Sequence, residues 1–455
     1  MSFTLRAIRE ELPPMVRLAA PLVAAELGWM LMGVVDTMMV GRLPESALSI
    51  GAVSLGHALF IVVALFGGGL LLGMDTLVAQ AFGAGNVADC HHSLLNGAYL
   101  ATVMTPLLMA VGWLSFPLFS LLGIDPALLQ LTIPYLKALL WGTLPLLLYF
   151  AFRRYLQAMN LVAPVAFALV SANLVNVVAN WALIYGHLGI PRMGVEGAGW
   201  ATCISRAYMA AVLLIAIVRH DRRYGTGLWA VASRPDPVRI RRLVALGFPA
   251  AIQLLLEISA FSAASALAGK LGALPLAAHQ IALNTASFTF MVPLGISSAA
   301  AVRVGQALGR RDAAGAAHAG WTALALGVSF MACAATLMLT VPHWIARIYT
   351  PDATVVAASA ALLMVAAFFQ LFDGMQVVSI GALRGAGDTR TAMLGHLVAD
   401  WFIGLPLGYY LAFHAGFGVA GLWAGLSVAM ILVGSVLLLV WNRQMHAAVR
   451  ERTTD

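Results

Sequence analysis

The sequence has little charge and few cysteines. Only 10% of its 455 residues are Asp, Glu, Lys or Arg, and 61% are hydrophobic. Soluble domains carry about 25% charged residues, so this composition excludes an ordinary soluble fold. The three cysteines, Cys90, Cys203 and Cys333, lack the spacing of a disulfide framework or a metal site. We interpret them as small packing residues.

Signatures of enzymes and of nucleotide binding are also missing. The glycines at 67–69 are not followed by the Lys-Ser/Thr pair of a phosphate-binding loop. His91 and His92 are adjacent, and His279 stands alone among apolar neighbours, so no catalytic constellation emerges. We expect no enzyme and no cofactor. Without a nucleotide-binding domain, any transport must draw its energy from an ion gradient.

Long apolar runs fill the chain, and each is long enough to cross a hydrocarbon core of about 30 Å as a helix. The first run follows residues of both charge signs without a small-residue cleavage site, so we do not interpret it as a signal peptide. The pattern predicts an all-α polytopic membrane protein. The twelve expected spans are 14–40, 46–82, 92–122, 127–158, 163–186, 194–218, 240–269, 275–308, 314–348, 354–383, 391–414 and 418–442.

Arginines between the spans indicate the orientation of the chain. Most of them, Arg153 and Arg154 included, fall on the side of the two termini, whereas the opposite loops carry few. The positive-inside rule therefore predicts that both termini are cytoplasmic, as an even number of spans requires. The same rule accounts for the net charge of +7, so we expect no nucleic-acid partner.

A polar segment divides the chain into two similar halves. We expect an N-terminal six-helix lobe at 1–218, a cytoplasmic linker at 219–238 and a C-terminal lobe with a cytoplasmic tail at 239–455. Pro21 and Pro249 lie 228 residues apart (249 minus 21), as do the triplets "GRL" from 41 and "GKL" from 269. Two parallel six-helix repeats around a cleft are typical of transporters that work by alternating access.

In the second half, acids lie within predicted spans beside amides and aromatic rings. Gln253, Glu257 and Phe261 recur every four residues and share a helix face. Asp373 shares a face with Phe369 and Gln370. Carboxylates at membrane depth supply charge, and rings supply a cation–π surface. We predict a site for a proton, a small cation or an organic cation; the alternative is that both acids are protonated packing groups.

In the first half, Asp36 and an amide stripe predict a second polar pocket. Asn173, Asn176 and Asn180 follow one another at spacings of three and four. Such a stripe can also simply pair helices. The roles of the remaining acids within spans stay open: Glu26, Asp75 and Asp400.

Four motifs in order resemble the multidrug and toxic compound extrusion (MATE) family over essentially the whole chain: "DTMMVG", "AQAFGAGN", "LRGAGDT" and "WFIGLPLGYY". Glu257 and Asp373 match the acidic pair of its NorM-like branch. The resemblance implies two pseudo-symmetric six-helix bundles in the bacterial inner membrane. It also implies an antiporter that exports lipophilic cationic drugs and dyes in exchange for H⁺ or Na⁺, which we expect to be monomeric.

The resemblance also assigns residues. Glu257 and Asp373 would hold the cation, Na⁺ included, and the substrate, while Asp36, Asn176 and Asn180 would form the pocket of the N-terminal lobe. Phe369 stands where some relatives have a tyrosine, which removes a hydroxyl ligand for Na⁺ and favours H⁺. Two alternatives remain: a related flippase for lipid-linked precursors, and a membrane-embedded enzyme. A dye-efflux assay separates an exporter of cations from a flippase.

Overall fold

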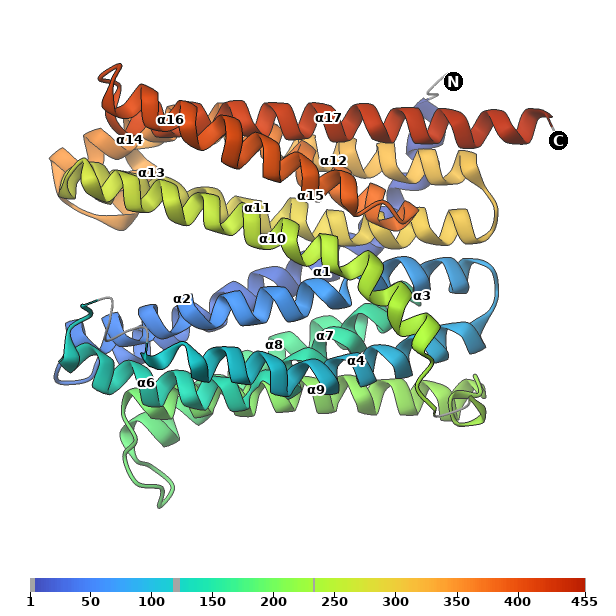
Figure 1. Ribbon diagram of the computed structural model, residues 1–455, viewed down its shortest axis with the longest axis horizontal. Coiled ribbons are helices and arrows are strands. Elements are labelled where there is room, and N and C mark those ends of the chain that lie inside the picture. Colours follow the sequence, from blue (N-terminus) through green and yellow to red (C-terminus); the bar gives the residue numbers. More distant parts are fainter. Residues whose placement is uncertain (1–4, 118–122, 232–233, 455) are drawn as a thin grey trace. The chain divides into compact units, whose positions relative to one another are not determined.

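The computed structural model describes residues 5–117, 123–231 and 234–454. Within these ranges every regular element is a helix (Figure 1). Their bounds are α1 Leu5–Val40, α2 Ser46–Leu71, α3 Gly73–Gly83, α4 Val87–Leu114, α6 Pro126–Trp141, α7 Thr143–Ala158, α8 Ala163–Tyr185, α9 Val195–Tyr224, η1 Leu228–Ala230, α10 Pro237–Lys270, α11 Ala273–Gly309, α12 Ala313–Thr340, α13 Pro342–Tyr349, α14 Ala353–Ala386, α15 Arg390–His396, η2 Leu397–Gly404, α16 Leu405–Phe413 and α17 Gly418–Thr454.

The helices follow the predicted spans closely. In the described part of the chain ten helical stretches are long and apolar enough to cross a membrane, and α6 with α7, bent by 44°, can form an eleventh. The predicted span at 391–414 corresponds to three consecutive segments: α15, the π-helix η2 and α16. The end of the predicted span 92–122 lies outside the described residues. The all-α polytopic fold is confirmed.

The chain forms two compact units that divide inside α1 and α10. The first, here called the N unit, is Ala24–Ala251; the second, the C unit, comprises the described residues of Met1–Val23 and Ile252–Asp455. Gly247 explains why the start of α10 belongs to the N unit. A Cβ there would lie 1.8 Å from the Leu70 carbonyl oxygen, so only glycine permits this backbone contact with α2. The lobe boundaries at 218 and 239 stay a prediction.

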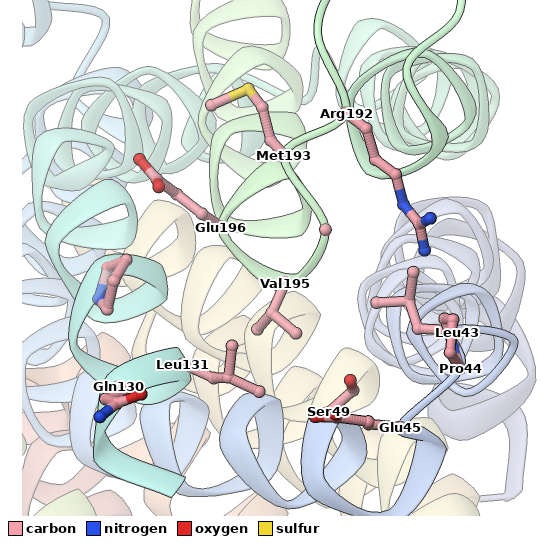
Figure 2. A pocket seen from close by; sticks show the side chains of 12 residues that line it. Leu43, Pro44, Glu45, Ser49, Gln130, Leu131, Arg192, Met193, Val195 and Glu196 are labelled. Atoms are coloured by element: carbon pink, nitrogen blue, oxygen red, sulfur yellow. The ribbon is translucent and has the colours of Figure 1, made fainter. Parts of the chain in front are cut away.

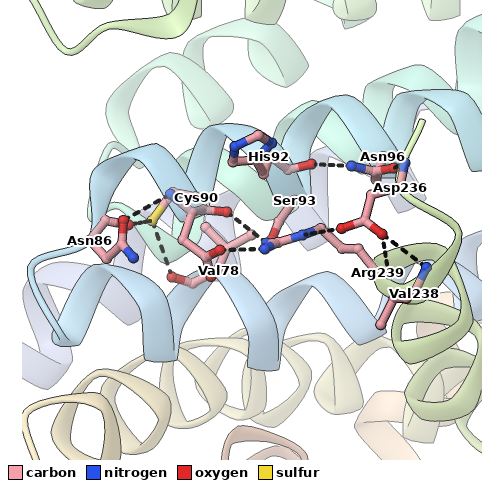
Figure 3. Close-up of polar contacts among 10 residues, drawn as sticks. Val78, Asn86, Cys90, His92, Ser93, Asn96, Asp236, Val238 and Arg239 are labelled. Atoms are coloured by element: carbon pink, nitrogen blue, oxygen red, sulfur yellow. Dashed lines mark hydrogen bonds and ion pairs between the residues drawn. The ribbon is translucent and has the colours of Figure 1, made fainter. Parts of the chain in front are cut away.

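The end of the predicted linker is fastened to α4 within the N unit (Figure 3). The Arg239 guanidinium pairs with the Asp89 carboxylate and donates to the Ser93 hydroxyl at 2.8 Å. The backbone N–H of Asp236 donates to the Asn96 side-chain oxygen at 2.8 Å. These contacts fix where α10 begins.

Candidate functional site

Asp36 is the centre of a buried polar cluster in the N unit. It lies on α1, and its carboxylate accepts hydrogen bonds from Asn180 on α8 at 2.6 Å and from Thr202 on α9 at 3.0 Å. The Asn180 amide also donates to the Asn176 side-chain oxygen at 3.0 Å. Three helices therefore meet at one carboxylate, and sequence reasoning had identified all of these residues except Thr202.

Asn173 belongs to a different contact. Its amide donates to the carbonyl oxygens of Gly28 at 3.0 Å and Leu169 at 2.9 Å. The structure therefore places it in the pairing of α8 with α1 and not beside Asp36. Asn173 and Asn180 are seven residues apart, so they lie nearly in line on α8 but about 10 Å apart along its axis, where they meet different neighbours.

A cavity of about 710 Å³ adjoins the Asp36 cluster. Its lining includes Asp36, Thr37, His57 and Tyr135, together with apolar side chains such as Met30 and Val34. This volume falls within the range of small-molecule sites, which are mostly apolar with a few polar groups. His57 and Tyr135 carried no sequence signal, because each stands alone in an apolar run.

A buried arginine lies close to this cluster. Arg206 follows Thr202 by one turn of α9 and is 3% exposed. Its guanidinium lies over the Phe60 ring at 4.3 Å and donates to the Leu139 carbonyl at 3.3 Å. The N unit therefore combines an acid and a fixed cation on adjoining helix faces, a combination that the sequence reading missed.

The N unit has a second cavity, of about 350 Å³, whose lining does not include Asp36 (Figure 2). It is formed where the loop after α1 meets the start of α6 and the start of α9. Glu45, Arg192 and Glu196 are its charged lining residues. None of the predicted site residues lines it.

The C unit brings Glu257 and Asp373 together through one amide. The Gln376 side-chain nitrogen donates to Glu257 at 3.1 Å and to Asp373 at 3.3 Å. Gln253 donates to the other Glu257 oxygen at 2.7 Å. The two acids are only 8% and 4% exposed. Sequence reasoning identified both acids and Gln253, whereas Gln376, a turn beyond Asp373, was missed.

The predicted aromatic rings form a layer beside the acids. Phe369 makes edge contacts with Phe261 at 5.9 Å and with Trp423 at 5.5 Å between ring centroids. Gln370 does not join the acid pair, because its amide donates to the Thr289 hydroxyl on α11 at 2.7 Å. In this structure the rings therefore pack on one another, and Gln370 ties α14 to α11.

The acids whose roles were open have partners. Glu26 pairs with Arg153, and Asp75 lies 3.4 Å from Arg154. The placement of these arginines in a loop was wrong: both lie within α7, and Arg153 is 2% exposed. Asp400 lies 2.8 Å from the Nδ1 atom of His396 in the C unit.

These clusters can bind cations or protons through carboxylates held in apolar surroundings. Among residues 5–117, 123–231 and 234–454, no group of three or more His, Cys, Asp or Glu side chains is arranged to hold a metal ion. Glu257 and Asp373 are a pair, and amide groups contact both Glu257 oxygens and one Asp373 oxygen.

Comparison with known proteins gives matches over nearly the whole chain. A sequence model of the MatE family matches residues 21–182 and again 249–410, segments that begin 228 residues apart (249 minus 21). The chain is 37% identical to a "Probable multidrug resistance protein NorM" of Mesorhizobium japonicum, over 97% of this chain and 95% of the relative. It is 38% identical to the "Multidrug resistance protein PmpM" of Pseudomonas aeruginosa, over 98% of this chain and 94% of the relative.

Solved structures show the same fold. The crystal structure of the eukaryotic MATE transporter AtDTX14 superposes with a TM-score of 0.85 at 22% identity, covering 98% of this chain and 99% of that one. An outward-facing multidrug resistance MATE family transporter of the MOP superfamily superposes with a TM-score of 0.83 at 19% identity, covering 95% of this chain and 96% of that one.

Proposed function

This chain belongs to the MatE family, and on that basis we propose that it is a secondary antiporter that exports lipophilic cationic drugs and dyes by alternating access. The inward movement of H⁺, Na⁺ or both supplies the energy. The proposal makes Glu257 and Asp373 the cation and substrate site of the C unit. It makes Asp36, with Asn176 and Asn180, the protonation-sensitive site of the N unit.

One observation carries this proposal: two carboxylates share a single amide donor inside an apolar helix bundle. Buried carboxylates are costly unless they are neutralised, so a cation or a proton is favoured there. The amide that bridges the two acids is neutral, so it does not balance the negative charge that they carry when ionised. A proton and an organic cation can therefore compete for the pair, which is what exchange requires.

The chain is a multi-pass membrane transporter and not an enzyme. We propose that it lies in the bacterial inner membrane, works as a monomer and needs no cofactor besides its coupling ion. Its partners are cationic small molecules and the lipid bilayer, without nucleic acid.

Dye transport by purified protein in liposomes tests the function directly. A Na⁺ gradient and a pH gradient are each imposed alone, and efflux of a cationic dye is followed. Dye movement driven by either gradient supports the antiporter and identifies its ion. Absence of dye movement, with translocation of a lipid-linked precursor in the same vesicles, would instead support the flippase.

Both termini are expected on the cytoplasmic side. Reporter fusions after residue 230 and at the C-terminus should give cytoplasmic signals, because the arginine-rich loops stay with the terminal side. A periplasmic signal at either position contradicts the proposed orientation. A fusion in the loop after Tyr185, between α8 and α9, provides the periplasmic control.

Asp36→Asn is expected to abolish proton-driven efflux while the protein still inserts. Asparagine keeps the size of the side chain and can accept from Thr202, but it cannot bind and release a proton. The matched control is Asp125→Asn, since Asp125 is an exposed acid of the same unit that caps α6, and asparagine caps a helix equally well. If Asp36→Asn transports at the wild-type rate across a pH gradient, the cluster is structural.

A further inference from the structure

A chain of hydrogen bonds extends from the acid pair of the C unit to a second titratable pair. The Gln376 amide, which contacts Glu257 and Asp373 through its nitrogen, places its oxygen 3.2 Å from the Nε2 atom of His396. The Nδ1 atom of the same imidazole lies 2.8 Å from Asp400 Oδ2. His396 and Gln376 are fully buried, and Asp400 is 1% exposed. We call His396 and Asp400 the dyad.

The backbone around the dyad is unusual. The π-helix Leu397–Gly404 begins directly after His396 and contains Asp400. π-Helical turns are rare and occur frequently at functional sites. The segment is fixed against α17 at Gly404, where a Cβ would lie 2.7 Å from the Ala429 methyl carbon. The dyad therefore lies in a segment that packs closely against α17.

Hydrogen-bond chemistry determines how many protons the dyad holds. Since the Gln376 amide nitrogen donates to the two acids, its oxygen faces His396 and needs an N–H there. The contact between His396 Nδ1 and Asp400 can then have one of two protonation states. Either the imidazole is doubly protonated beside ionised Asp400, or Asp400 is protonated beside the neutral ring. In both cases the dyad carries one proton more than a neutral imidazole with an ionised carboxylate.

If the Gln376 amide is rotated the other way, the dyad must hold one proton fewer. When a cation neutralises Glu257 and Asp373, the Gln376 oxygen becomes the better partner for that cation. Rotation of the amide then turns its NH₂ group toward His396 Nε2, which must present a lone pair. The ring keeps its proton on Nδ1 beside ionised Asp400, and the dyad has released one proton. Positive charge enters the acid pair as positive charge leaves the dyad.

We propose that the His396–Asp400 dyad is a proton site of the C unit, and that Gln376 makes a proton on the dyad and a cation at Glu257 and Asp373 mutually exclusive. This inference rests on the proposed antiport and gives it a coupling device. His396 is a positioning and proton-holding residue that never touches the substrate. The titratable side chains that face it are Asp400 on its own segment and, through Gln376, Glu257 of α10 and Asp373 of α14; α17 offers none from Gly418 to Trp441.

Proton release on binding a cationic dye in weak buffer tests the dyad. His396→Gln should release about one proton fewer per bound dye than wild type, and the slope of log affinity against pH should fall by about one. His279→Gln is the matched control. His279 is also a fully buried histidine of the C unit, but its hydrogen bonds go to Ser265 and Trp423 and not to Gln376 or the acids. Unchanged proton release and pH slope in His396→Gln overturn the proposal.

A second measurement does not depend on dye binding or on His396 variants that fold poorly. In ¹⁵N-histidine-labelled protein at one pH, His396 should be protonated on Nε2 in wild type and should lose that proton in Glu257→Gln, whose acid pair has lost a negative charge. In the dye-binding assay described above, Asp400→Asn should lower proton release as His396→Gln does. If wild type binds no dye, the proposed function fails; if it binds dye but His396 keeps one protonation state in every variant, only the dyad fails.

Discussion

Glu257→Gln and Asp373→Asn are each expected to lower the affinity for a cationic dye by about 10- to 100-fold. Two unit charges about 4 Å apart attract by about 4 kcal/mol at an effective dielectric constant of about 20, and each 1.4 kcal/mol is tenfold in affinity. Part of that attraction is offset because binding desolvates both charges. The measurement is dye binding to detergent-purified protein across pH.

In wild type, dye affinity should fall as pH falls, because protonation removes the charges that attract the dye. The amide variants should show a weaker dependence. Expression should be nearly unchanged, since an amide is close to isosteric and avoids burying a charge. Asp352→Asn is the matched control: Asp352 is an exposed acid at the start of α14, the helix of Asp373, and caps it through Thr354 at 2.8 Å. Identical affinities in wild type and both variants would show that these acids only pack helices.

Arg153→Met is expected to destabilise the protein by about 3–5 kcal/mol, the usual cost of removing one partner of a buried ion pair. The pair joins α7 to α1, and Arg153 is almost fully enclosed, so Glu26 would be left as an uncompensated charge. The double variant Glu26→Gln, Arg153→Met should recover most of the loss, because no buried charge remains. The free energy of unfolding in mixed micelles gives the measurement.

The more exposed pair Arg239 and Asp89 provides the comparison. Their side chains are 19% and 36% exposed, and exposed pairs contribute about 0–1 kcal/mol. Arg239→Met should therefore cost much less than Arg153→Met. An equal loss in the two variants, or no recovery in the double variant, would contradict the role assigned to the buried pair.

The sequence alone was sufficient for the family and for the helical membrane fold. The four motifs and the 228-residue offset between Pro21 and Pro249 agree with the two segments that the family model matches. Apolar runs predict membrane helices because each span must satisfy its own backbone hydrogen bonds and face lipid, and both requirements are local in sequence. The acids within the spans could also be identified locally, since a carboxylate is easily recognised in an apolar run.

Only the tertiary structure decided which polar side chains meet. Thr202 joins Asp36 across 166 residues, and Gln376 joins Glu257 across 119. Neither hydroxyls nor amides are rare enough in membrane helices to mark such partners in a sequence. His396 and Asp400 are four residues apart, a spacing that already places them on one helix face, but only the fold brings His396 against Gln376. Arg153 was assigned to a cytoplasmic loop because the sequence locates span ends only to within several residues. In the structure it is buried in α7, where it pairs with the Glu26 carboxylate of α1. Composition and periodicity thus determine which helices form, whereas the directions of side chains around packed helices determine the site.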